Sequence, residues 1–537
     1  MDLIVEDCVI LPMAGSNPTA AAMLIRDGKI VVVGTVENAR SAALPGARVV
    51  RLAGATVIPG LIDAHCHVST VGYLMAAADC SQPSAPDIPA IQARLRQAAG
   101  RTPPGSWVAG YGYVEYHLRE RRHPSRDDLD EAVPDRPVVV YHTSLHACVL
   151  NSPALAEAGF TDRQPDPPGG VLGRDDDGRI NGVIFEGPMF DLFERNRRRD
   201  LAAMDSAQRA QLVAAAGRYF AERGITTACE ADLRRDALSI FAECDESGTL
   251  PMRIYGLAVH QEVDWLIAAG LRGRHSSRLA VEAVKIWADG GMSSRTAAIH
   301  GTYPVPPYGS GILFFEPAEL AAMVKDLDAR GFQVAIHAQG DRAIESVLDA
   351  YAGVLAGTGA NPRRHRIEHG GAMFPALVAR AAALGIVVAS QPGFLSRLGD
   401  GFVEAFGDRA AQLYPFASWL RAGIVTAGSS DAPVITADPR LGIRDAALRH
   451  TESGTVLGAA ERLDLRAALA LYTRGAAYAI HREQEIGTLQ PGKLADFTVL
   501  DSNPITTPPE QITDITVLAT VVDGEAVYQQ HEMFVER

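Results

Sequence analysis

Residues 57–67 read VIPGLIDAHCH, an apolar run with β-branched residues that ends in His65, Cys66 and His67. A run of this kind is typical of a strand buried on both faces, as in a parallel sheet. Residues i and i+2 of an extended strand point the same way, so both imidazoles can reach one ion while Cys66 points away. A single His-x-His pair is a weak signal, and its meaning depends on the rest of the chain.

Seven similar runs follow, and they alternate with helical stretches rich in Ala, Leu and Arg. They are residues 224–232, 252–259, 281–289, 332–339, 365–370, 386–392 and 424–431. The stretches between them, such as PAELAAMVKDLDARG, end at Gly just before the next strand, as helix C-termini do. Eight βα units in sequence predict an α/β fold with a (β/α)8 TIM barrel over residues 57–484.

Three segments do not belong to these units. Residues 1–56 and 485–537 contain short β-branched stretches broken by Gly, and neither end has enough strands for a sheet of its own. We therefore expect a small β-sandwich domain built from both termini. Residues 106–210, between the first and second strand runs, are too long for a loop and predict an insertion subdomain after strand 1.

Charge and cysteine content limit the partners and the compartment. The 537 residues include 50 Lys and Arg against 64 Asp and Glu, a net charge of −14. This charge disfavours nucleic acid and anionic membranes as partners, so we expect a small-molecule substrate. Six cysteines without CxxC spacing indicate a reducing compartment. The acidic N-terminus and the lack of a membrane-length apolar run predict a cytoplasmic protein.

Residues that can bind metals stand where the predicted strands end. They are His65, His67, Lys285, His337, His369 and Asp431. The carboxyl ends of all strands in a parallel barrel face one mouth, so these side chains can converge there. Each alone could be a core histidine, a lysine extending to water or an aspartate in a turn. Their joint placement at strand ends favours one site.

Several motifs agree in order with those of a known family. VIPGLIDAHCHV, VKIWADGGMSSRTA, VAIHAQGDRAI, RHRIEHG and AGSSDAPV, together with GTLQPGKLADFTVLD near the end, run through the whole chain. In this order they resemble the signatures of the amidohydrolase superfamily of metal-dependent hydrolases, specifically the branch called amidohydrolase family 3.

The resemblance implies a ligand set. It implies that His65, His67, His337, His369 and Asp431 bind a divalent metal, and that Lys285 is N6-carboxylated to a carbamate that bridges two ions. Without the carbamate we expect a single ion. Zinc is the first choice for imidazole and carboxylate ligands, and manganese, iron and cobalt remain open.

The expected chemistry follows from these ligands. Metal-activated hydroxide attacks a carbonyl, with Asp431 as general base and then acid, and His337 and His369 complete the predicted catalytic set. We predict hydrolysis of a C–N bond other than a peptide bond, in an N-acyl or N-formyl amine, a lactam or a related amide. A deaminase, or an ester or carbamate hydrolase, is the alternative on the same metal site. An inactive scaffold ranks below both because no ligand position is lost.

Five further residues are candidates for contact with the substrate. They are Trp107, Tyr113, His142, His146 and Arg295. An aromatic wall, imidazole donors and a guanidinium that binds a carboxylate would suit an amide pocket. For each residue alone, packing or a surface hydrogen bond explains its presence equally well. A homodimer is compatible with such a fold, although no residue specifically indicates it.

Overall fold

The computed structural model describes residues 2–15, 19–103, 105–304, 309–356 and 361–534. Contacts divide the chain into two compact units. Unit 1 comprises Met1–Ser69, Val213–Ala288 and Phe315–Arg537, and unit 2 comprises Thr70–Leu212 and Asp289–Phe314. No helix within these described ranges is long and apolar enough to cross a membrane.

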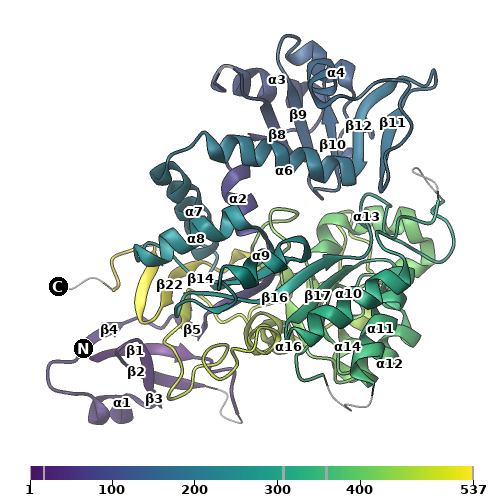
Figure 1. Cartoon of the computed structure of the whole chain (residues 1–537). Coiled ribbons are helices and arrows are strands. Elements are labelled where there is room, and N and C mark those ends of the chain that lie inside the picture. The colour runs from purple at the N-terminus through teal and green to yellow at the C-terminus, as the bar shows by residue number, and fades with distance from the viewer. Residues whose placement is uncertain (1, 16–18, 104, 305–308, 357–360, 535–537) are drawn as a thin grey trace. The chain divides into compact units, whose positions relative to one another are not determined.

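Unit 1 contains a nearly closed barrel of eight parallel strands, which confirms the predicted (β/α)8 fold (Figure 1). In chain order the strands are β6 (Leu61–Cys66), β13 (Ile225–Leu233), β14 (Arg253–Val259), β16 (Leu279–Trp287), β17 (Gln333–Ala338), β18 (Arg366–His369), β19 (Val387–Ser390) and β20 (Thr426–Gly428). Seven coincide closely with predicted runs, whereas the first run, 57–67, is divided at Gly60: β5 (Thr56–Pro59) pairs in the sheet of the chain ends, and only Leu61–Cys66 form the barrel strand. Almost all of their side chains are buried, which is why the strands read as continuous apolar runs.

Helices follow the strands and cover the outside of the barrel (Figure 1). They include α8 (Arg235–Glu246), α10 (Pro317–Ala329), α11 (Asp341–Leu355), α12 (Pro375–Ala383) and α14 (Phe416–Arg421). In α11, the buried residues Ile344, Val347, Leu348 and Tyr351 recur at helical spacing and form the face toward the sheet.

The barrel closes without a regular ladder between its first and last strands. The order of hydrogen-bonded strands runs from β20 to β6 with no pairing between these two. Two backbone hydrogen bonds join the turn after β20 to the end of β6: the Asp431 amide donates to His65 O at 2.8 Å, and the His67 amide donates to Ala432 O at 2.7 Å. The closure therefore brings a predicted carboxylate ligand beside the His-x-His pair.

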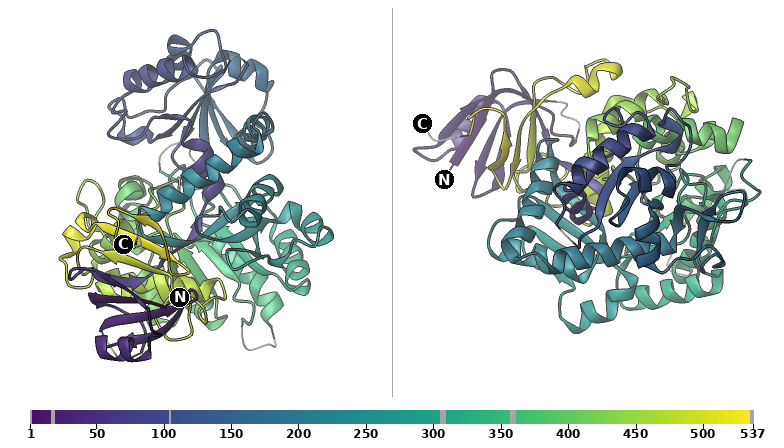
Figure 2. Two further views of the ribbon diagram at one scale, coloured as in Figure 1. Left: turned by 90° about the vertical axis from the view of Figure 1, so that its left-hand side faces the viewer. Right: turned by 90° about the horizontal axis from the view of Figure 1, so that it is seen from above.

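The two ends of the chain form one sheet of eight strands within unit 1 (Figure 2). The strands are β1 (Asp2–Ile10), β2 (Ala20–Arg26), β3 (Lys29–Gly34), β4 (Arg48–Arg51), β5 (Thr56–Pro59), β21 (Phe497–Leu500), β22 (Val517–Val522) and β23 (Glu525–Gln529). β5 links the two ends, because it pairs with β1 on one side and with β21 on the other. The N-terminal end contributes five of these strands and the C-terminal end three, so the sheet is built from both ends as predicted.

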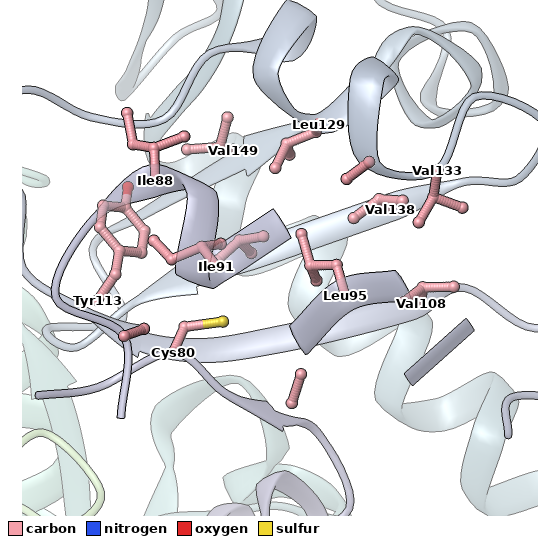
Figure 3. Close-up of a cluster of buried hydrophobic side chains, with 14 of the residues drawn as sticks. Cys80, Ile88, Ile91, Leu95, Val108, Tyr113, Leu129, Val133, Val138 and Val149 are labelled. Carbon is pink, nitrogen blue, oxygen red and sulfur yellow. The ribbon is translucent and has the colours of Figure 1, made fainter. Parts of the chain in front are cut away.

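Unit 2 has its own sheet of six strands, in the order β11-β12-β10-β9-β8-β7. These strands are β7 (Ala78–Asp79), β8 (Val108–Tyr113), β9 (Val138–His142), β10 (Ala147–Leu150), β11 (Gly170–Arg174) and β12 (Ile180–Glu186). Ile88, Ile91 and Leu95 of α3 (Ile88–Ala99) pack on the sheet in a buried core (Figure 3). The predicted insertion at 106–210 lies within unit 2, which also includes residues 70–105 and 289–314.

Candidate metal centre

The six predicted metal-binding residues all belong to unit 1, at the carboxyl ends of its strands. His65 lies in β6, Lys285 in β16, His337 in β17 and His369 in β18, while His67 directly follows β6 and Asp431 follows β20. All are buried except His67, which is partly exposed. Because the strands are parallel, these ends lie on one side of the barrel, where residues far apart in the sequence meet.

Three of these side chains form a compact group. The Asp431 Oδ1 atom lies 3.1 Å from His67 Nε2 and 3.4 Å from His65 Nε2. The donor atoms of the three residues all lie within 4.8 Å of one another. Two imidazoles and a carboxylate at this separation can bind one divalent ion.

The other three side chains adjoin this group. The Lys285 Nζ atom lies 3.3 Å from His65 Nε2. The His369 ring centroid is 4.7 Å from that of His65 and 4.5 Å from that of His337, and His369 Nδ1 is 4.0 Å from Asp431 Oδ2. All six predicted ligands therefore belong to one continuous cluster.

Two acceptors that sequence reasoning missed hold the imidazole rings. His65 Nδ1 donates to the Glu368 carboxylate, and His369 Nδ1 donates to Gln391 Oε1 at 2.9 Å. The Glu368 carboxylate in turn accepts two hydrogen bonds of 2.8 Å from the Arg366 guanidinium. The sequence signal for this pair is the alternation of two charged residues along a buried strand, which places both on one face.

The charge state of the cluster suits a metal. Burial, together with the charge of Lys285, holds the pKa of His65 well below its ordinary value, so this ring is neutral. With its proton on Nδ1, His65 presents the Nε2 lone pair to Asp431 and His67. Burial also lowers the pKa of Lys285 to about 8. Burial lowers the pKa of His67, but its hydrogen bond to the Asp431 carboxylate outweighs this and raises that pKa above its ordinary value, so an ion that binds there displaces a proton from the ring. With that proton lost, two imidazoles beside a carboxylate are ligands that zinc and related ions prefer, so the residues fit such an ion.

The backbone at two of these positions is strained. His369 has φ 70° and Asp431 has φ 58°, in the left-handed region that residues with side chains rarely adopt. Such strain persists where surrounding contacts fix it, and it is frequent at functional sites. At Asp431 the fixing contact comes from Asp63, whose buried carboxylate accepts from the Ser430 amide at 3.1 Å and from the Ser430 hydroxyl.

The two aromatic candidates for substrate contact are core residues of unit 2. Trp107 packs in a buried apolar cluster, and its Nε1 donates to Glu157 Oε1 at 2.8 Å. Tyr113 lies in the core beneath α3, and its hydroxyl is 2.9 Å from His123 Nδ1 (Figure 3). Packing accounts for both residues, and their contact with a substrate stays a prediction.

The remaining candidates lie at the turn between the central strands β9 and β10 or in the loop at 289–314. His142 Nε2 lies 3.0 Å from Glu115 Oε2, and His146 Nδ1 lies 2.8 Å from Glu186 Oε2. Arg295 adopts φ 60° in a turn of that loop. The two histidines thus pair with carboxylates of unit 2, and the role of all three residues in binding substrate stays a prediction.

Comparison with known proteins identifies the family of the chain. The profile of the amidohydrolase family matches residues 48–528. The N-substituted formamide deformylase of Arthrobacter pascens is 30% identical over 541 residues, which cover 98% of each chain. Protein LONG AFTER FAR-RED 3 of Arabidopsis thaliana is 30% identical over 546 residues, 98% of this chain and 91% of that protein.

Solved structures show the same fold. An uncharacterized metal-dependent hydrolase from Pyrococcus horikoshii OT3 superposes with a TM-score of 0.76 at 25% identity, over 95% of this chain and 99% of the other. The family match extends over nearly the whole chain, including every strand end that bears a candidate ligand. The chain therefore belongs to the amidohydrolase family of metal-dependent hydrolases.

Proposed function

We propose that this protein hydrolyses a C–N bond other than a peptide bond, in an N-formyl or N-acyl amine, a lactam or a related amide. The observation that supports it most is the group of His65, His67 and Asp431, whose donor atoms lie within 4.8 Å of one another. The relative named N-substituted formamide deformylase makes N-substituted formamides the first substrates to test.

The proposed site holds one or two divalent ions, with zinc as the first choice. A divalent ion bound there supplies Lewis acidity, which lowers the pKa of water and polarises a carbonyl. His65, His67, His337, His369 and Asp431 would hold it through imidazole nitrogens and carboxylate oxygens. His337 and His369 thereby belong to the proposed catalytic set.

Asp431 is the residue that we propose moves the proton. Its Oδ1 faces both His65 and His67, and its Oδ2 faces His369. In this position the carboxylate accepts a proton from the attacking water, whose oxygen adds to the carbonyl carbon. It then gives that proton to the departing nitrogen as the C–N bond breaks, so the same group serves as base and acid.

Lys285 is the proposed sixth ligand, as a carbamate. A protonated lysine is repelled by a nearby dication, whereas the neutral amine can add CO2, lose a proton and become an anion. Burial already lowers the pKa of Lys285 to about 8, which favours the neutral amine.

The Lys285→Ala variant tests this role. We expect it to lose bound metal and activity, with partial rescue by acetate or propionate that replaces the missing carboxylate. Lys325→Ala, on the exposed face of α10, is the matched control and should behave as wild type. Wild-type turnover by Lys285→Ala would contradict the ligand role.

The reaction itself is tested with metal-replete enzyme on a panel of N-substituted formamides, other N-acyl amines, lactams, esters, carbamates and deaminase substrates. We expect turnover of a formamide or another amide, loss of it on chelation, and recovery with zinc. The proposal fails if the purified protein holds less than one transition ion per chain and chelation leaves activity unchanged. Preference for an ester or for deamination would select the alternative chemistry.

We further propose a cytoplasmic location and a small-molecule substrate, with no nucleic acid or membrane partner. The location is proposed from the six cysteines without CxxC spacing, which are typical of a reducing compartment. Cell fractionation tests the location, and light scattering of the purified protein tests the proposed homodimer.

A further inference from the structure

The barrel interior of unit 1 contains an ion pair that the proposed reaction leaves without a role. Arg366 and Glu368 of β18 are both fully buried. Arg366 donates from Nε and Nη2 to the two carboxylate oxygens, each at 2.8 Å. Removing such a pair from water costs several kcal/mol per ion, and apolar residues of similar size are often as stable. Stability alone is therefore a weak reason for this pair.

The pair connects two strands that are not neighbours in the barrel. Around the barrel, β19 and β20 lie between β18 and β6 on the side where the barrel closes, and β17, β16, β14 and β13 lie between them on the other side. From β18, Glu368 accepts a hydrogen bond from His65 Nδ1 on β6. Arg366 Nη2 also donates to Ala64 O at 2.8 Å, and Ala64 directly precedes His65. The ion pair thus fixes both the His65 ring and the backbone that bears it.

These contacts determine which nitrogen of His65 faces the other ligands. A proton held on Nδ1 leaves the lone pair on Nε2, the atom that lies 3.4 Å from Asp431 Oδ1. The acceptor for His369 is different, because Gln391 is a neutral amide that itself donates to Ser429 Oγ at 2.9 Å. Of these two rings, His65 is therefore the one held by a carboxylate, which is itself fixed by Arg366.

We propose that Glu368 is a positioning residue that holds His65 Nε2 toward the metal position, and that Arg366 holds Glu368 in place through its two hydrogen bonds. This inference rests on the proposed function, since it assigns a role relative to the metal of that site. Glu368 acts only through His65 and contacts no reacting atom.

The Glu368→Gln variant tests the proposal by zinc affinity, measured in competition with a chelating dye on metal-free protein. We expect affinity to fall about 10- to 100-fold, the usual effect of removing such an outer partner. With Co²⁺ in place of zinc, the visible absorption spectrum should change, because the His65 ligand is reoriented. Neither signal depends on turnover.

Asp445→Asn is the matched control. Asp445 is also a buried carboxylate, hydrogen-bonded to Ser396 and Arg444, and the substitution is again carboxylate to amide. It lies on α15 (Pro439–Leu448) and is not among the cluster residues. Zinc affinity and the Co²⁺ spectrum should match wild type in this variant.

A second variant covers the case in which Glu368→Gln fails to fold because Arg366 loses its partner. Combining Arg366→Met with Glu368→Gln removes both buried charges, and circular dichroism reports whether the fold is kept. We expect this folded double variant to show the same weakened zinc binding. Wild-type zinc affinity in either folded variant overturns the positioning role alone. Absence of zinc binding in the wild type overturns the proposed function and this inference together.

Discussion

Asp431 combines an unusual backbone with a central position among the candidate ligands. Its left-handed φ of 58° would be unfavourable in isolation. Two hydrogen bonds hold the turn: the Asp431 amide donates to His65 O, and the amide of the neighbouring Ser430 donates to Asp63. These contacts fix where the carboxylate stands before any substrate arrives. Pre-organisation of this kind is what a proton-transferring group needs.

Asp431→Asn should therefore separate binding from proton transfer. The amide keeps the shape and one oxygen donor but cannot take up a proton at neutral pH, so we expect kcat to fall about 10²- to 10⁴-fold while some metal is retained. Steady-state kinetics with metal analysis of the same sample measure both effects. Asp445→Asn serves as the control, and a kcat within tenfold of wild type would exclude the proton-transfer role.

Asp445 gives a pH-dependent stability that can be predicted in sign. Burial raises the pKa of Asp445 to about 6, above its ordinary value of 3.8. The native state therefore keeps a proton that the unfolded chain releases between about pH 4 and 6. The stability due to that proton is fully present below about pH 4 and is lost as pH rises through about 6.

Asp445→Asn removes this titration while nearly preserving shape. The free energy of unfolding of the variant, relative to wild type, should rise between about pH 4 and pH 8 by up to about 3 kcal/mol, because a shift of two pKa units corresponds to that amount. Urea unfolding of both proteins at each pH measures the difference. A difference that is constant across this range would show that Asp445 keeps an ordinary pKa in the folded protein.

At the scale of elements, β18 shows what sequence reasoning can reach and where it stops. Its apolar context and its terminal histidine predicted both a strand and a ligand in RIEH, because strand burial and the alternation of side chains are local properties. The partner of Glu368 was not predictable, since His65 lies 303 residues away. Contacts across the barrel depend on strand order and register, which no local pattern contains.

Helix α7 (Ser206–Ala221) offers a test of close packing. A Cβ added at Gly217 would lie 1.9 Å from Pro251 Cγ, well inside van der Waals contact. Alanine normally stabilises a helix by up to about 1 kcal/mol over glycine. Here we expect the clash to dominate, so that Gly217→Ala lowers the free energy of unfolding by about 1–3 kcal/mol.

Gly353 in α11 is the matched control for this substitution. A Cβ there would meet nothing within 4 Å, so Gly353→Ala should gain stability through helix propensity alone. Urea unfolding of both variants measures whether each substitution raises or lowers the free energy of unfolding. Stabilisation of both would mean that α7 shifts away from Pro251 at little cost.

At the scale of the whole molecule, the sequence predicted the barrel more completely than the parts around it. Barrel strands are buried on both faces and repeat with a regular helical interval, so each gives an independent signal. The sequence carries no comparable signal for the extent of unit 2, because residues 289–314, which follow β16 of the barrel, belong to this unit. Which unit such a segment belongs to is determined by its packing against residues far away in the sequence.

Arg253 connects the barrel to the terminal sheet within unit 1, and its removal should be costly. From β14 it donates to Asp496 at 2.7 and 2.9 Å and also to Asp523, and the Arg253 and Asp496 side chains are buried. Arg253→Ala leaves the buried Asp496 carboxylate without its cation, whereas the partly exposed Asp523 keeps an ion pair with Arg278 at 3.4 Å. We expect the free energy of unfolding of unit 1 to fall by about 3–5 kcal/mol, the usual cost of breaking a buried pair from one side.

A variant without the three charges distinguishes the cost of an unpaired buried carboxylate from the cost of lost packing. Arg253→Met combined with Asp496→Asn and Asp523→Asn removes all three charges and keeps most of the volume, so it should recover much of the stability that Arg253→Ala loses. Urea unfolding followed by tryptophan fluorescence compares the two variants with wild type. If the single variant loses less than about 1 kcal/mol, the cluster behaves as an exposed ion pair would, and the barrel and terminal sheet are held together by their apolar contacts instead.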